Sequence, residues 1–240
     1  MIDYTPLEIT KKRKGNFFYL PCDTVFFNDF TIHFIKSVKL HAKNISIHVH
    51  IYDATDADID WCKQNNIGYT TEITPASYNT LDLKKGYWVN SRFLRVSEIF
   101  HDNANVMAVD PDGLVVEDLS LNEWLQDMEN DWVAMRTKGV GALGGCVAFA
   151  AGKPGRYHLK QKIIKLAQPE GLVWFLDQTA LNALVAEQKI NTFSMKYVDY
   201  HLRPDSKIWT GKGAKKYFRE NVKPKKNKFA TKLEEYKKKI

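Results

Sequence analysis

The chain alternates between short apolar runs and longer amphipathic stretches, and this pattern predicts strands and helices in turn. Residues 17–22, 45–52 and 68–73 are apolar runs typical of buried strands. Between them, residues 24–44 carry apolar side chains at helical spacing, and residues 58–65 are typical of a short helix. Strands that alternate with helices in this way are joined by crossovers, so we expect them to lie parallel in one sheet.

The second half of the chain continues the alternation. A helix is predicted at residues 91–101, and it leads into an apolar strand that ends at Asp110. The elements predicted after it are strands at residues 132–136 and 145–149, a flexible flap or a tight hairpin at residues 139–145, and helices at residues 157–167 and 175–188. We therefore expect a single α/β domain of Rossmann-like kind, with a mixed, mainly parallel sheet flanked by helices. Its ligand crevice would lie outside the carboxyl ends of the strands.

Two carboxylates, Asp110 and Asp112, follow the apolar strand at the place where that crevice is expected. Carboxylates two residues apart at a strand end can both reach one hard divalent cation, which prefers oxygen ligands and can also hold a diphosphate. The alternative is that the acidic pair only closes the strand as a turn. Asp23 falls at the end of an earlier predicted strand, and this shared placement favours a site.

The net charge of +7 is concentrated at the C-terminus. Residues 212–240 contain twelve Lys or Arg and three Glu, while residues 1–211 contain 23 basic and 25 acidic residues. We therefore predict a domain at residues 1–218 and a basic tail at residues 219–240. The tail would contact an anionic membrane surface, an acidic acceptor or nucleic acid, or it is a solvated lysine-rich helix.

Other features point to a cytoplasmic protein, with peripheral membrane contact through the tail left open. The sequence has neither a secretory signal nor an apolar window long enough to span a bilayer. Cys22, Cys62 and Cys146 are scattered, so we expect buried, reduced thiols. His48 and His50 share one face of a predicted strand, and we interpret them as a polar pair on its more hydrated face rather than as metal ligands.

Several spaced motifs resemble those of retaining GT-A-fold glycosyltransferases, the group that includes glycogenin and bacterial galactosyltransferases. The similarity covers roughly residues 17–218. The motifs are Cys-Asp-Thr-Val-Phe at 22–26, Ser-Val-Lys-Leu at 37–40, Ser-Arg-Phe at 91–93, Val-Asp-Pro-Asp-Gly-Leu-Val at 109–115, Gly-Cys-Val-Ala-Phe at 145–149, Asp-Gln-Thr-Ala-Leu-Asn at 177–182, and Thr-Gly-Lys-Gly-Ala-Lys-Lys-Tyr-Phe at 210–218.

The resemblance implies a GT-A-like fold and the transfer of a hexose from a nucleotide-diphosphate sugar, most readily a UDP sugar, to an unidentified glycan, lipid-linked or protein acceptor. It implies a divalent cofactor, Mn²⁺ or Mg²⁺. It implies that Asp177, with Gln178, lies beneath the sugar and takes part in catalysis. It implies metal binding by Asp110, Asp112 and Thr210. The residues implied to bind the donor are Asp23, Phe26, Arg92, Asp110, Gly211, Gly213 and Lys216.

Two positions depart from the family pattern. Thr210 stands where the family has a metal-binding His, and Ala150 stands where it has an Asn. These departures leave two alternatives to an active transferase open. One is a nucleotide-sugar binding protein with weakened catalysis, and the other is a nucleic-acid-associated transferase or binder that uses the basic tail.

Overall fold

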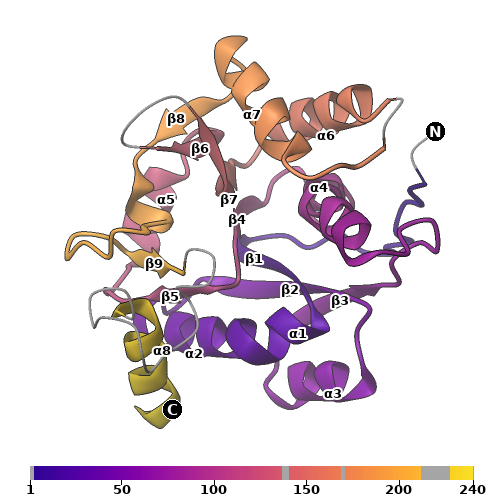
Figure 1. Ribbon diagram of the computed structural model, residues 1–240. Helices are drawn as coiled ribbons and strands as arrows, with labels where there is room; N and C mark the ends of the chain where they lie inside the picture. Colours follow the sequence, from indigo (N-terminus) through magenta and orange to yellow (C-terminus); the bar gives the residue numbers. More distant parts are fainter. Residues whose placement is uncertain (1–2, 137–140, 169–170, 212–227, 240) are drawn as a thin grey trace.

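A seven-stranded sheet forms the centre of the computed structural model, which describes residues 3–136, 141–168, 171–211 and 228–239 (Figure 1). The strands are β1 (Asn16–Asp23), β2 (Ser46–Tyr52), β3 (Gly68–Glu72), β4 (Asn105–Val109), β6 (Trp132–Met135), β7 (Ala142–Phe149) and β8 (Asn191–Phe193). Their order is β3-β2-β1-β4-β7-β6-β8, and the first four strands are mutually parallel. β7 is antiparallel to both β4 and β6, so the sheet is mixed and mainly parallel, as predicted.

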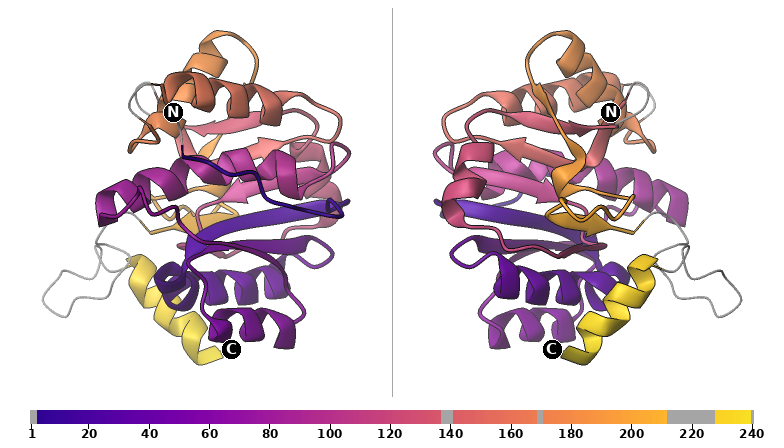
Figure 2. Two further views of the ribbon diagram at one scale, coloured as in Figure 1. Left: turned by 90° about the vertical axis from the view of Figure 1, so that its right-hand side faces the viewer. Right: turned by 90° about the vertical axis from the view of Figure 1, so that its left-hand side faces the viewer.

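Helices cover both faces of this sheet (Figures 1 and 2). They are α1 (Thr24–Phe26), α2 (Ile32–His41), α3 (Asp56–Gln64), α4 (Leu81–Ile99), α5 (Leu121–Asp127), α6 (Gly155–Leu166), α7 (Leu176–Ala186) and α8 (Lys228–Lys239), with a π-helical turn at Phe27–Thr31 and a 3-10 turn at Met195–Tyr197. A small second sheet pairs β5 (Gly113–Val115) with β9 (Ile208–Thr210).

The alternation of side chains along β1 builds a separate core on each face. Phe18 and Leu20 pack with the core that includes residues of α2, α3 and α5. Phe17 and Tyr19 pack with the core that includes residues of α4, α6 and α7. Because successive strand residues point to opposite faces, one apolar strand anchors helices on both sides of the sheet.

The helix expected at residues 91–101 is longer and lies earlier in the chain. α4 begins at Leu81, where the Thr80 hydroxyl accepts a hydrogen bond from the backbone N–H of Leu83, and it ends at Ile99. Its first turn is exposed, and Leu81 is 61% accessible, so this turn carries no apolar stripe that the sequence could reveal.

The glycine-rich segment predicted as a flap or hairpin at residues 139–145 is largely strand. Residues 142–145 belong to β7 and are buried, while residues 139 and 140 lie outside the described part of the chain. The prediction for His48 and His50 was also wrong, because both side chains are fully buried rather than placed on a hydrated face. The three cysteines are free and buried, as expected.

The last helix packs on the domain. α8 places Phe229, Leu233 and Tyr236 in a small cluster with Phe30 and Leu114. The Tyr236 hydroxyl also donates a hydrogen bond to the carbonyl oxygen of Val115 at 3.2 Å. The described end of the basic region is therefore tied to the main body by apolar contacts. Within the described residues, no helix has both the length and the apolar character needed to cross a bilayer.

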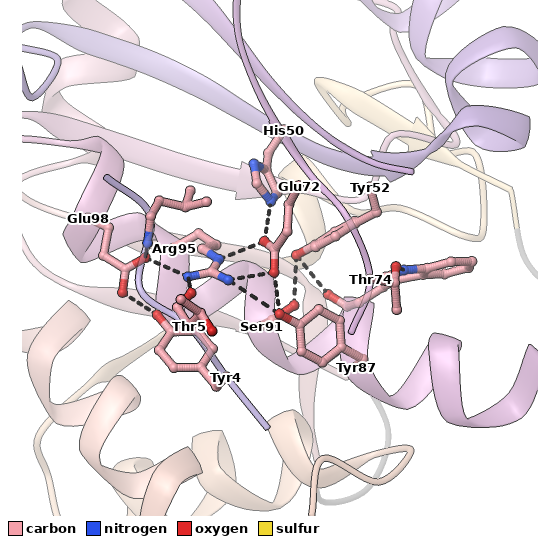
Figure 3. A network of polar contacts seen from close by, with 12 residues as sticks. Tyr4, Thr5, His50, Tyr52, Glu72, Thr74, Tyr87, Ser91, Arg95 and Glu98 are labelled. Carbon is pink, nitrogen blue, oxygen red and sulfur yellow. Dashed lines mark hydrogen bonds and ion pairs between the residues drawn. The ribbon is translucent and has the colours of Figure 1, made fainter. Parts of the chain in front are cut away.

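A buried polar network holds α4 against the sheet (Figure 3). The Arg95 guanidinium donates to both carboxylate oxygens of Glu72, at 2.7 and 2.5 Å, and these side chains are 1% and 6% exposed. His50 donates to Glu72 at 3.0 Å, and Tyr87 also hydrogen bonds to it. Arg95 pairs in addition with Glu98 at 2.7 Å. These contacts connect β2, β3 and α4 at one point in the core.

Removing the Glu72 charge should destabilise the fold. In Glu72→Gln, Arg95 loses its two-point partner inside the core, and breaking a buried pair of this kind typically costs about 3 kcal/mol. Urea unfolding at neutral pH should show this loss in the free energy of unfolding. The control Glu235→Gln, on the exposed side of α8, should stay within about 0.5 kcal/mol. Equal stability of the two variants would contradict the role given to the network.

The same variant should change the response to acid. Burial raises the pKa of Glu72, but hydrogen bonds from His50 and Arg95 outweigh this and lower it from 4.5 to about 2. A carboxyl with a lowered pKa stabilises the fold above its ordinary pKa, and this contribution is lost as the pH falls toward the folded value. Glu72→Gln should therefore lose less stability than the unmodified chain over this window in acid melting curves.

Candidate active site

The candidate site lies at the carboxyl ends of neighbouring parallel strands. Asp23 is the last residue of β1, and Asp110 follows the last residue of β4, which is hydrogen bonded to β1. The backbone N–H of Asp110 donates to the carbonyl oxygen of Gly145 at 2.9 Å, which attaches this end of β4 to β7. Asp23 and Asp110 therefore lie at the edge of the sheet where the sequence predicted the ligand site.

Arg92 links the two carboxylates, Asp110 and Asp177, for which the family resemblance implies the main roles. Its guanidinium donates to Asp110 Oδ1 at 2.5 Å and to Asp177 Oδ2 at 3.1 Å. It also donates to the carbonyl oxygen of Gly144 at 2.9 Å. Side chains from α4, the end of β4 and α7 thus meet at one buried guanidinium, whose fork geometry allows several directed contacts at once.

Asp177 lies in the first turn of α7 but does not cap it. The residue before the helix is Phe175, whose left-handed φ of 67° is uncommon for a bulky side chain, and no side chain caps this end. Asp177 is 3% exposed, and burial raises its pKa, while the charge of Arg92 opposes that rise. The carboxyl is therefore held by Arg92, with Gln178 half-buried beside it.

Two glycines of β7 allow these carboxylates to approach the strand. A Cβ atom on Gly144 would lie 2.4 Å from Asp177 Oδ2, and one on Gly145 would lie 2.8 Å from Asp110 Oδ2. Both distances are shorter than non-bonded contacts allow, so the pair of glycines is required by the close packing of the acidic groups. Gly145 is part of a motif in the sequence, but the close approach of Asp177 to Gly144 was not predicted.

The second sheet brings Asp112, Thr210 and Gly211 together. Gly113 pairs with Thr210 in the register of β5 and β9, and the backbone N–H of Gly211 donates to the carbonyl oxygen of Asp112 at 3.0 Å. The side chains of Asp112 and Thr210 are both buried, and Thr210 Oγ1 has no hydrogen-bond partner among the described residues. A buried hydroxyl without a partner is costly, which makes this oxygen a candidate ligand atom.

The residues present fit a hard cation through oxygen donors alone. Asp110 and Asp112 supply carboxylates, and Thr210 supplies the unpartnered hydroxyl on the adjacent strand. No group of three His, Cys, Asp or Glu side chains suited to a metal occurs in the described residues. Any metal held here would therefore complete its coordination with ligand oxygens or water, and Arg92 already binds one oxygen of Asp110.

The remaining predicted donor-binding residues are placed as follows. Asp23 caps α1 by accepting a hydrogen bond from the backbone N–H of Phe26 at 2.9 Å. Phe26 is half-buried and its ring centroid lies 5.4 Å from that of Phe30. Gly213 and Lys216 lie outside the described residues. The structure thus brings Arg92, Asp110 and Asp177 into contact and places Asp112, Thr210 and Gly211 on the adjoining strand pair.

Tyr200 is coupled electrostatically to the site, although no sequence motif identified it. Burial raises the pKa of Tyr200, and the negative charges of Asp110 and Asp112 raise it further. A lone tyrosine in an irregular segment carries no signal in the sequence. Its place becomes visible only when the chain leading to β9 is folded against β5.

Replacing Arg92 by lysine should show whether the site needs the several hydrogen bonds of the guanidinium or only its positive charge. Arg92→Lys keeps the positive charge but cannot reach Asp110, Asp177 and the Gly144 carbonyl oxygen together, so buried Asp177 loses its partner. We expect the free energy of unfolding to fall by about 3 kcal/mol in urea titrations. Arg136→Lys, at an exposed arginine, is the matched control and should change it by less than about 0.5 kcal/mol. An Arg92→Lys chain as stable as this control would show that the three-way contact is dispensable.

Comparisons with known proteins agree with this architecture. No protein-family model matches the sequence, and no curated protein matches it. Two structures of the glycosyltransferase GlyE from Streptococcus pneumoniae TIGR4 are similar in fold. The apo form has a TM-score of 0.63 at 17% identity, and a second structure has 0.61 at 16%. Each match covers 95% of this chain and 64% of the GlyE chain. The chain described here therefore shares the fold of these two structures and spans less than two thirds of their length.

Proposed function

We propose that this chain is a glycosyltransferase that moves a hexose from a nucleotide-diphosphate sugar, most readily a UDP sugar, to an acceptor with the help of a divalent metal. The observation that carries the proposal is the three-way contact of Arg92 with Asp110 and Asp177 at the carboxyl edge of a glycosyltransferase-like sheet. Asp110 follows the last residue of β4, and Asp177 lies in the first turn of α7. Arg92 sets the spacing between them.

The leaving nucleoside diphosphate gains negative charge as its bond to the sugar breaks, and stabilising that charge is the main requirement of the reaction. Asp110, Asp112 and Thr210 would hold Mn²⁺ or Mg²⁺, which supplies Lewis-acid stabilisation of that charge. Arg92 adds a fixed positive charge to the site, and the backbone around Gly211 adds donors, with Gly213 and Lys216 proposed to contribute further.

Asp177, with Gln178 beside it, is assigned to the sugar. Its carboxylate would face the positive charge that develops on the ring, and the charge of Arg92 opposes the rise in its pKa that burial causes. We propose transfer with retention, either by a front-side reaction or through a short-lived covalent intermediate. Asp23 and Phe26, on the turn after β1, are proposed to contact the nucleotide base.

A catalytically weakened nucleotide-sugar binding protein is the second candidate. It is favoured by Thr210 in place of the family's metal-binding His and by the Arg92 contact that engages one oxygen of Asp110. Both features would weaken the hold on a metal while leaving a nucleotide pocket intact. Slow hydrolysis of a bound donor in the purified protein, which a transferase shows and a pure binder does not, separates the two.

The basic C-terminal region remains a proposed contact with an anionic membrane surface or with nucleic acid. Deleting the tail would be a poor test, since Phe229 and Leu233 cover Phe30 and Leu114 and their loss would expose this cluster. Substitution of exposed lysines such as Lys237 and Lys238 by Gln leaves α8 in place. If retention on anionic vesicles or on duplex DNA is unchanged in that variant, these lysines have no part in the contact.

A donor panel tests the proposed function. Melting temperatures measured with UDP, other nucleoside diphosphates and their sugars, each with Mn²⁺ or with chelator, should rise with one uridine donor only when metal is present. A ligand at a hundred times its dissociation constant adds about 2.7 kcal/mol to the stability of the folded state. Asp110→Asn should abolish the shift, while Asp205→Asn, at an exposed position, should retain it. The absence of any shift with every donor would refute the proposal.

Thr210→Val tests the metal ligand separately. Valine has nearly the shape of threonine, so removing a buried hydroxyl that lacks a partner should leave metal-free stability unchanged or slightly higher. The same change should weaken Mn²⁺-dependent donor binding by about tenfold, because one ligand oxygen is lost. Metal affinity equal to that of the unmodified chain would exclude Thr210 from the coordination sphere without affecting the assignment of Asp110.

A further inference from the structure

A hollow of about 850 Å³ opens at the opposite edge of the sheet from the candidate active site. It is formed where β1, β2 and β3 begin, and its lining includes Phe17, residues 45–48 and residues 66–68. The segment of residues 10–14 forms another part of its wall. β1 has eight residues, so at about 3.3 Å per residue the two edges are roughly 25 Å apart.

The lining of this hollow, called here the basic hollow, is strongly positive. It includes no Asp or Glu. None of its cationic side chains forms an ion pair with a carboxylate of the described residues, although the rest of the chain has many such pairs. The cationic side chains are Lys11, Lys12, Arg13, Lys14 and Lys39. Gathering five like charges around one concavity raises the free energy of the empty protein, and an anion in the hollow would relieve that repulsion.

The wall of the basic hollow is fixed by hydrogen bonds. The backbone of Arg13 bonds to Ile99 and His101 on both sides, each at 2.8 Å, so this segment lies along the chain that follows α4. Lys12 Nζ donates to the carbonyl oxygen of Ser97 at 2.6 Å, and Lys39 Nζ donates to that of Asn65 at 3.0 Å. These hydrogen bonds hold the ammonium groups of Lys12 and Lys39 near the body, although both side chains are exposed.

The inner wall is uncharged. His48 contributes to it, and burial together with the positive charges of Arg13 and His50 lowers the pKa of His48 to about 3. The imidazole is therefore neutral at ordinary pH, and the positive charge comes from the exposed side chains at residues 11–14 and from Lys39. An anion would enter with its charge toward these side chains and its body toward Phe17 and His48.

We propose that the basic hollow binds a compact, multiply charged, phosphate-bearing anion, such as a short inorganic polyphosphate or a phosphorylated sugar. The volume lies within the range of small-molecule sites. A membrane or a nucleic acid would instead favour lysines spread over an open face, whereas these are drawn around a concavity. The proposal is independent of the proposed glycosyl transfer, because it uses none of the residues at the carboxyl edge.

Calorimetric titration of the full chain with inorganic tripolyphosphate in the presence of chelator tests the proposal. We expect one equivalent to bind without metal. Lys11→Gln/Lys14→Gln should weaken binding at least about tenfold, since each lost charge-assisted hydrogen bond is worth a factor of this order. The control Lys237→Gln/Lys238→Gln removes the same charge from the exposed side of α8 and should stay within about twofold. Asp110→Asn should bind as the unmodified chain does.

Four results would overturn the proposal. These are no binding at low salt, equal weakening in both double variants, loss of binding in Asp110→Asn, and binding of anionic vesicles or duplex DNA through Lys11 and Lys14 without binding of tripolyphosphate. The third result would place the anion in the candidate active site. The fourth would identify a macromolecular surface. Because the donor panel requires metal and Asp110 while this titration requires neither, failure of one test leaves the other intact.

Discussion

The candidate site depends on one buried guanidinium between two carboxylates. Arg92 is 8% exposed and Asp177 is 3% exposed, so neither charge can be left without the other at acceptable cost. The contact fixes α4, the end of β4 and α7 relative to one another, because moving any of them away would leave a buried charge without its partner. The two glycines of β7 are part of the same constraint, since a larger residue would occupy the space of the carboxylate oxygens.

α4 carries a second buried arginine one helical turn further on. Arg95 joins Glu72 at the end of β3 while Arg92 joins Asp110 beyond the end of β4, and residues three apart lie on the same side of a helix. The helix is therefore attached to the sheet through two arginines, of which Arg95 binds both oxygens of Glu72 and Arg92 binds one oxygen of Asp110. A rotation of α4 large enough to release Arg92 would also break the Glu72 pair, so the network in Figure 3 supports the precision of the site.

Patterns in the sequence predicted what depends on periodicity and on strand ends. The parallel order of the first strands and the position of Asp110 follow from apolar runs and crossovers, and the structure confirms both. Contacts between segments far apart in the chain produce no such pattern, so the sequence did not predict them. The exposed start of α4 has no apolar stripe, and the burial of His50 depends on a Glu72 that is 22 residues away. Tyr200 and Gly144 join the site through the fold alone.

The net charge summed along the chain was the least informative property, because the fold places acidic and basic side chains at different edges of the sheet. Residues 1–211 are almost neutral, yet the carboxyl edge gathers Asp110 and Asp177 around one arginine, while the amino edge gathers five cations. Under the two proposals, a diphosphate at the carboxyl edge binds together with a cation held by Asp110 and Asp112, whereas an anion in the basic hollow binds without one. Dependence on metal is therefore the property by which the two proposed sites are to be distinguished.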